Sequence, residues 1–193
     1  FDLAESLLAL MDEMHGEGVT PEDIANLDVT DESGHWERAL AFFRIVQPYF
    51  EAASDAPGTE QRQRAVIEAL AEHWAGTPPE DPIIVAGSTG SRGGTALLME
   101  AVATLPQGAV ILPGFDFDMP DSVWDRLDDA LTGEDHPQFR FRTLMERLAI
   151  RPKQVMTWTD AEPASPSRNA LLSLSLRPAP VTDEWLSEGP SLK

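Results

Sequence analysis

A loop rich in glycine and hydroxyl side chains is the first place where this sequence could do chemistry. The loop consists of Gly87, Ser88, Thr89, Gly90 and Ser91, and Arg92 follows it. The apolar residues 83–86 before it predict a buried strand, and a helical pattern comes after it. Backbone N–H groups and a helix N-terminus at such a corner can hold a phosphate. The alternative interpretation is a tight strand-to-helix turn with hydroxyl caps.

This loop does not have the pattern of an ATP-binding P-loop. A P-loop follows the pattern Gly-x-x-x-x-Gly-Lys-[Ser/Thr], and its lysine reaches the β- and γ-phosphates. The sequence contains only Lys153 and Lys193, and neither is near the loop. ATP binding of the P-loop kind is therefore not expected here.

Two carboxylates follow a second predicted strand. Asp116 and Asp118 would point to the same side of an extended backbone. Such a pair could hold Mg²⁺ together with a substrate phosphate, although two carboxylates alone make a sparse site. The alternative is a solvated loop whose acids cap a helix that begins at Pro120 or Asp121. We predict no metal site, and Asp116 and Asp118 are the residues to examine if one exists.

The only local concentration of positive charge comprises Arg140, Arg142, Arg147, Arg151 and Lys153. Arg140 and Arg147 share one face of a predicted helix, and two phenylalanines are interleaved with the arginines. This arrangement could contact phosphates and stack on bases. The same arginines could instead pair with neighbouring acids or form a solvated helix face.

Composition restricts the classes of function. The chain has 193 residues, with 14 Lys and Arg against 33 Asp and Glu, a net charge of −19. Such an acidic chain argues against nucleic-acid binding as its whole role. The absence of Cys excludes disulfides and thiolate metal centres, and the four histidines show no zinc-binding spacing. We predict no cofactor.

Targeting signals are also lacking in this sequence. No apolar run has the length that a membrane-spanning helix requires, and no signal-peptide pattern precedes the first predicted helix. From the lack of such signals we expect a cytoplasmic protein without a membrane partner. Because the sequence opens at Phe1 without an initiator Met, we also expect it to be part of a longer protein.

Proline and glycine divide the sequence into three predicted parts. Residues 1–80 form acidic helices, and Thr20 has the pattern of a helix N-cap. Residues 81–160 contain two continuous apolar strands around a helix, as in a βαβ unit whose strands are buried on both faces. Residues 154–158 are predicted to form a third strand. Residues 161–193 form a helical C-terminal extension.

Helical spacing of apolar residues supports this division. It predicts helices that begin near Leu3, Pro21, Trp36 and Thr59, with Thr59 as a cap, and later helices over residues 123–133, 139–150 and 167–176.

Several strings of residues resemble the AddB family, subunits of the bacterial AddAB helicase–nuclease that processes double-strand DNA breaks for recombination. The strings are VAGSTGS at 85–91, TALL at 95–98, LPQGAV at 105–110, LPGFD at 112–116, and EDHPQF at 134–139. Residues 3–4 and 10–14 and the pair His35-Trp36 also resemble sequences of that family, so the resemblance covers most of the chain.

The resemblance implies an α/β fold that contains a partial RecA-like sheet. This sheet is P-loop-NTPase-like but degenerate, with flanking helices and an N-terminal all-helical subdomain that matches a helicase 1B-like insertion. The strand at 83–86 would replace the Walker B strand, and the segment 109–116 would replace a Gly-Asp sensor loop. An ATPase needs a carboxylate after its Walker B strand to hold Mg²⁺. This chain has Ala86-Gly87-Ser88-Thr89 there, so ATP hydrolysis by these residues is not expected.

The implied function is a catalytically inactive, helicase-like scaffold in an ATP-dependent helicase and deoxyribonuclease of DNA double-strand break repair. The expected partners are an AddA-type motor subunit and, within the complex, single-stranded or duplex-end DNA. The residues predicted to contact DNA are Arg92, Arg140, Arg142 and Arg147. The loop at 87–91 would be a degenerate nucleotide site, and we predict no catalytic residue. The alternatives are a nucleotide- or phosphate-binding α/β module that uses this loop, and an acidic protein–protein interaction domain.

Overall fold

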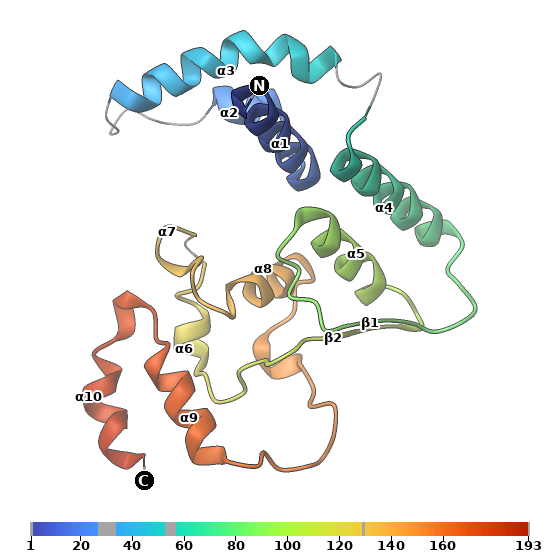
Figure 1. The fold of residues 1–193 in the computed structure, drawn as a ribbon. Helices are drawn as coiled ribbons and strands as arrows, with labels where there is room; N and C mark the ends of the chain where they lie inside the picture. Colours follow the sequence, from blue (N-terminus) through green and yellow to red (C-terminus); the bar gives the residue numbers. More distant parts are fainter. Residues whose placement is uncertain (1, 27–33, 53–56, 129, 193) are drawn as a thin grey trace. The chain divides into compact units, whose positions relative to one another are not determined.

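The computed structural model describes residues 2–26, 34–52, 57–128 and 130–192 (Figure 1). The chain divides into two compact units. The first comprises Phe1–Pro78 and Arg92–Leu98, and the second comprises Pro79–Ser91 and Met99–Lys193. The division of the sequence into domains at 1–80, 81–160 and 161–193 stays a prediction.

The first unit is helical. Its helices are α1 (Asp2–Glu17), α2 (Pro21–Ala25), α3 (Gly34–Ala52), α4 (Thr59–Gly76) and the first part of α5 (Gly93–Ala103). Met11 and Met14 of α1 and Val46 of α3 form its buried apolar cluster. Their spacing of three residues on α1 places both methionines on one face of that helix.

The prediction that Thr20 is the N-cap of α2 is confirmed. The Asp23 N–H donates to the Thr20 Oγ1 at 3.2 Å, and the Thr20 N–H donates to the Asp23 carboxylate at 2.8 Å. This is a reciprocal capping box. The hydrogen bonds from Thr20 hold the pKa of Asp23 below its usual range.

The start of α4 differs from the sequence prediction. Its N-cap residue is Gly58 rather than Thr59, and Gly58 has no side chain that could cap the helix. The cap comes from α1 instead, because the Asp12 carboxylate accepts a hydrogen bond from the Glu60 N–H at 3.3 Å. In return, Arg64 of α4 donates to the carbonyl oxygen of Gly16 at the end of α1, at 3.1 Å. Each helix therefore satisfies backbone groups at an end of the other.

The second unit contains the predicted βαβ arrangement. Strands β1 (Ile83–Ala86) and β2 (Gly108–Ile111) are parallel and adjacent, with Ile83 opposite Gly108 and Ala86 opposite Ile111. Helix α5 connects them in the sequence (Figure 1). The coarse α/β class is therefore confirmed.

Two strand predictions are wrong. The strands are not buried on both faces, because β1 alternates between half-buried and exposed residues and Ile84 is 55% exposed. Residues 154–158 do not form a third strand. Gln154 is the last residue of the short 3₁₀ helix η2 (Pro152–Gln154), and residues 155–158 do not join the sheet. Met156 and Trp158 are 87% and 72% exposed. A favourable strand composition does not make a strand when no neighbour pairs with it.

Short helices make up most of the rest of the second unit. They are α6 (Asp121–Trp124), α7 (Ala130–Gly133), α8 (Phe139–Arg147), α9 (Pro166–Ser175) and α10 (Glu184–Glu188), with 3₁₀ helices η3 (Ala179–Val181) and η4 (Gly189–Ser191). The single helix predicted over 123–133 is wrong. The Arg126 and Leu127 N–H groups donate three residues back, to Val123 and Trp124, and this tighter turn ends α6.

Helix α8 ends earlier than the predicted residue 150. Ala149 lies in the left-handed region with φ 53°, and the Ile150 N–H donates to the carbonyl oxygen of Met145 at 2.9 Å. This pattern of a left-handed residue with a hydrogen bond back across it terminates helices.

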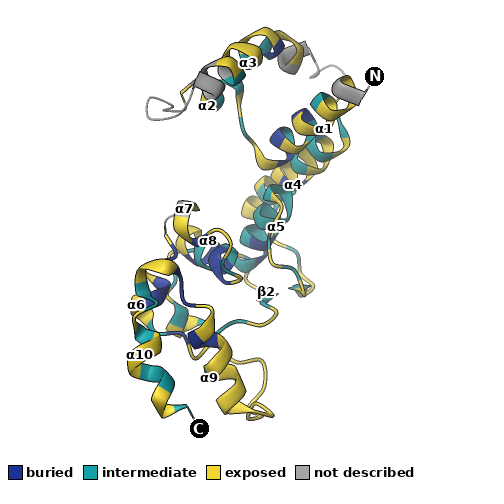
Figure 2. Cartoon of the chain, turned by 60° about the vertical axis from the view of Figure 1, so that its left-hand side comes forward, coloured by how far each residue is buried: buried dark blue, intermediate teal, exposed yellow. Residues whose placement is uncertain are grey.

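The core of the second unit lies between α6 and α8. Its buried members are Met119, Val123, Trp124, Leu127, Phe141 and Met145. Figure 2 shows buried residues on α8, whereas α9 and α10 are mostly exposed. This core supports the loop that leaves β2, because Leu112 and Phe115 of that loop pack against it.

Candidate functional site: an aromatic pocket with an acidic rim

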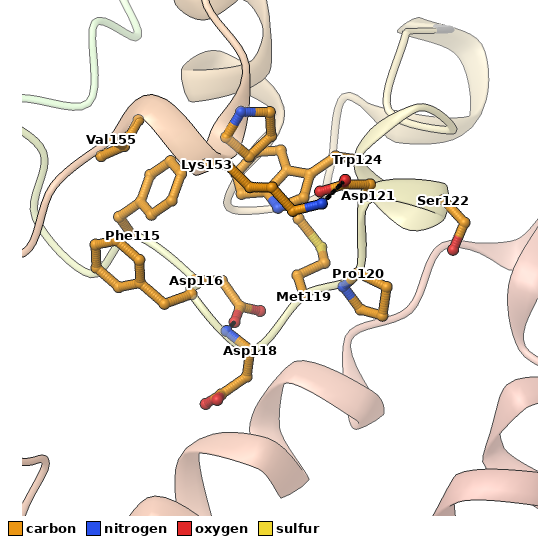
Figure 3. A pocket seen from close by; sticks show the side chains of 12 residues that line it. Phe115, Asp116, Asp118, Met119, Pro120, Asp121, Ser122, Trp124, Lys153 and Val155 are labelled. Carbon is orange, nitrogen blue, oxygen red and sulfur yellow. Dashed lines mark hydrogen bonds and ion pairs between the residues drawn. The ribbon is translucent and has the colours of Figure 1, made fainter.

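A pocket of about 610 Å³ lies on the loop that follows β2 (Figure 3). It contains the segment in which the sequence predicted paired carboxylates. The lining residues are Phe115, Asp116, Phe117, Asp118, Met119, Pro120, Asp121, Ser122, Trp124, Pro152, Lys153 and Val155. We call this site the β2 pocket.

Three aromatic rings build one wall of the β2 pocket. Phe115 stacks on Trp124, with ring centroids 5.0 Å apart and planes at 20°. Phe117 packs against Phe115, with ring centroids 4.9 Å apart and planes tilted at 60°. Trp124 is 2% exposed, whereas Phe117 is 54% exposed. The exposed ring of Phe117 thus packs against the half-buried Phe115, which is stacked on the buried Trp124.

The carboxylates of the loop lie on a turn rather than on an extended backbone. The Asp116 Oδ1 accepts a hydrogen bond from the Asp118 N–H at 3.0 Å (Figure 3). This bond across two residues is an Asx turn. The sequence prediction that Asp116 and Asp118 point to the same side assumed an extended backbone. The backbone turns here, so that assumption does not hold.

A buried glutamine holds this loop in place. The Gln138 side chain donates to the Gly114 carbonyl oxygen at 2.9 Å and accepts from the Asp116 N–H at 3.1 Å. Gln138 is 7% exposed, so both bonds are shielded from water. Sequence reasoning missed this role, because nothing in the spacing of Gln138 and Gly114 predicts that they meet.

Charge at the β2 pocket is unbalanced. Lys153 forms an ion pair with Asp121, while Asp116 and Asp118 add two further carboxylates (Figure 3). Three carboxylates and one ammonium group leave an excess of two negative charges. Within the described part of the chain, no group of three or more His, Asp or Glu side chains is arranged to hold a metal ion.

The loop at residues 87–91 is a tight turn with a hydroxyl contact. Gly87 and Gly90 have φ of 78° and 66°, a region that suits glycine. The Gly90 N–H donates to the Ser88 Oγ at 3.2 Å. The first N–H of the following helix, that of Gly93, donates to the Glu17 carboxylate at 2.8 Å. A phosphate at this N–H would have to displace Glu17.

Each arginine that the sequence predicted for DNA contact forms an ion pair with a glutamate. The pairs are Arg92–Glu60 at 3.3 Å, Arg140–Glu134 at 3.0 Å, Arg142–Glu146 at 3.4 Å and Arg147–Glu100 at 3.8 Å. The interleaved Phe139 and Phe141 are 9% and 1% exposed, so their rings are not available to stack on bases. This arrangement agrees with the alternative interpretation from the sequence, in which these arginines pair with acidic side chains.

A buried arginine in the second unit had no signal in the sequence. The Arg177 side chain is 2% exposed and forms ion pairs with Glu184 at 3.2 Å and Glu188 at 3.4 Å, both on α10. The charge of Arg177 also acts on His136. Burial lowers the pKa of His136, and the charge of Arg177 acts in the same direction, while Asp116 opposes it.

Comparison with known proteins gives no match to a family model, a curated protein or a solved structure. None of the described helices combines the length and the apolar character that a bilayer crossing requires.

Proposed function

We propose that this chain is a catalytically inactive, helicase-like scaffold segment of a DNA double-strand break repair helicase–nuclease, of the AddB kind. The proposal rests on the resemblance of the residue strings given above. The prediction that the segment is catalytically inactive depends on the residues of the loop after β1. A motor ATPase would keep acids for Mg²⁺ there, and this chain has Ala86, Gly87, Ser88 and Thr89.

We further propose that β1, α5 and β2 belong to a RecA-like sheet. A parallel pair with a helical connection is the repeating unit of such sheets. Only two strands pair among the described residues, and two strands alone rarely form a stable parallel sheet. In this proposal further strands come from elsewhere in the subunit.

The ion pairs argue against DNA contact as the main role of this segment on its own, so packing against a motor subunit stands first in this proposal. Arg92, Arg140 and Arg147 would have to exchange a glutamate for a DNA phosphate, so DNA contact depends on the assembled complex. The net charge of −19 supports a low affinity of this segment alone for DNA.

The test uses the full-length subunit that contains this chain, purified with its motor subunit. We expect the two to co-purify and to bind single-stranded DNA on filters at low salt. Replacing Arg140, Arg142 and Arg147 together with Ala should lower DNA retention. The matched control replaces Arg126 and Arg168, two arginines without an ion pair in the described part of the chain. Unchanged retention would remove the DNA-contact role, and failure to co-purify would overturn the scaffold proposal.

Calorimetric titration of the 193-residue chain with ATP and Mg²⁺ separates the scaffold from the nucleotide-binding alternative. We expect no heat of binding, because Glu17 occupies the first N–H of α5 and no P-loop lysine is present. Binding at micromolar concentrations that is lost in Ser88→Ala would favour the alternative at residues 87–91.

A further inference from the structure

We propose that the β2 pocket binds the guanidinium group of an arginine side chain presented by a partner protein. This inference goes beyond the scaffold function and does not depend on it. It follows from three properties of the pocket: an exposed aromatic ring packed on a half-buried one, an excess of negative charge, and a carboxylate without a partner in the described part of the chain.

The ring of Phe117 provides a flat surface for a planar cation. It is supported from one side by Phe115, which is itself stacked on the buried Trp124. A guanidinium group stacks on aromatic faces and is attracted by the negative charge density of the ring. An ammonium group stacks less well because it is compact and strongly hydrated.

The carboxylate of Asp118 is available to pair with such a cation. It takes part in no hydrogen bond or ion pair within the part of the chain that the structure describes, whereas Asp121 is paired with Lys153. Figure 3 shows Asp116 and Asp118 on the same turn beside the aromatic residues. A guanidinium group can donate two parallel hydrogen bonds to one carboxylate while its plane covers a ring.

The charge at the pocket excludes the other obvious ligands. Two excess negative charges would repel a phosphate or a nucleotide. A purely apolar side chain would remove the Asp118 carboxylate from water without giving it a partner. The volume of about 610 Å³ lies within the usual range of ligand pockets. It leaves room for residues on either side of the arginine, so a protein segment fits better than a small amine.

Nuclear magnetic resonance of the isotope-labelled 193-residue chain tests this proposal. The probe is a blocked pentapeptide, Gly-Gly-Arg-Gly-Gly. We expect millimolar peptide to shift the signals of residues 115–121 and the indole signal of Trp124. The same peptide with citrulline, which keeps the shape but has no charge, should produce no shifts, and the lysine peptide should bind more weakly.

Two variants identify the groups that bind. Asp118→Asn and Phe117→Leu should each weaken the affinity for the arginine peptide by roughly two- to fivefold, which is the range expected for losing an exposed ion pair or cation–aromatic contact. Both side chains are exposed, so the fold should persist. Asp128→Asn is the matched control, because Asp128 is exposed and outside the pocket.

The proposal fails if no signal of the pocket moves, if the citrulline peptide binds equally well, or if Asp118→Asn leaves the affinity unchanged. It also fails if a single-stranded oligonucleotide shifts the same signals more strongly than the arginine peptide. These results would not affect the co-purification test of the scaffold function.

Discussion

The carboxylate of Glu17, the last residue of α1, accepts a hydrogen bond from the backbone N–H of Gly93, the first residue of α5, at 2.8 Å. The two chain segments approach closely here, since a Cβ atom on Gly93 would lie 2.8 Å from the Cα of Glu17. A negative charge at the start of a helix is favourable, because the unpaired N–H groups carry partial positive charge. A side chain of this protein therefore takes the place that a bound anion would otherwise occupy.

Replacing Glu17 with Ala should lower the free energy of unfolding by about 0.5–1 kcal/mol. The Gly93 N–H would lose its acceptor, and the loss is modest because the bond is exposed to water. Urea unfolding at neutral pH measures the change. Glu13→Ala on the same helix is the control, since Glu13 is exposed and has no partner in the described part of the chain. Equal losses in both variants would contradict the capping role.

Gly108→Ala should destabilise the second unit by about 1–3 kcal/mol, as overpacking does. The new Cβ atom would collide with the carbonyl oxygen of Val102 and lie 2.9 Å from the Cβ of Leu105. Thermal unfolding of the chain measures this loss. Gly76→Ala at the end of α4, where nothing lies within 4 Å of the new atom, should leave stability unchanged or raise it slightly. A tolerated Gly108→Ala would show that the β2 start can shift.

Because Arg177 is buried in its ion pairs, replacing Arg177 and replacing its glutamate partners should lower the free energy of unfolding by different amounts. Replacing Glu184 and Glu188 together with Gln leaves a buried guanidinium without a counter-charge and should cost about 3 kcal/mol or more. Arg177→Met should cost less, because the two glutamates are partly exposed and can turn to water. Denaturant unfolding of both variants gives the order. The reverse order would argue that Arg177 acts through packing rather than charge.

Stability should fall as the pH drops below about 6.5, the ordinary pKa of histidine. The pKa of His136 is lowered in the folded chain, mainly by burial, so the unfolded chain takes up this proton first. The His136 Nδ1 also accepts a hydrogen bond from the Gln138 N–H at 3.1 Å, and protonation of Nδ1 would break it. The decrease begins near pH 6.5 and stops once the pH passes below the pKa of the folded state.

Urea unfolding between pH 7.5 and 5, compared with the His136→Asn variant, measures this dependence. Asn keeps an acceptor near the Gln138 N–H but does not titrate, so the slope should become flatter in the variant. His73→Asn on the exposed face of α4 should leave the slope unchanged. Parallel slopes in the original chain and the His136→Asn variant would rule out His136 as the cause.

Local patterns predicted the elements of this fold better than their contacts. The apolar runs at 83–86 and 109–112 correctly predicted the two parallel strands, and Thr20 correctly predicted the start of a helix. These patterns depend only on residues that are close together in the sequence. The Asp12 cap of α4 joins residues 48 positions apart, so no local pattern predicts it. The third strand failed for the same reason: strand formation depends on a pairing neighbour that composition does not specify.

For the candidate site, too, the sequence predicted some residues but not the contacts between them. The sequence located the Asp116 and Asp118 loop, but not its turn or the stacking of Phe115 on Trp124, which depend on how α6 folds back. It identified the arginines, but not partners such as Glu60 and Glu100, which are distant in the sequence.

The sequence contains five tryptophans, and their exposure differs widely: Trp124 is 2% exposed, whereas Trp158 and Trp185 are 72% and 48% exposed. Acrylamide should quench the long-wavelength part of the emission first, because that light comes from indoles in water. The remaining blue-shifted light then includes the emission of Trp124, which is stacked on Phe115. A ligand that binds at this wall of the pocket should change the contribution of Trp124, and a Trp124→Phe variant should lose that part of the response.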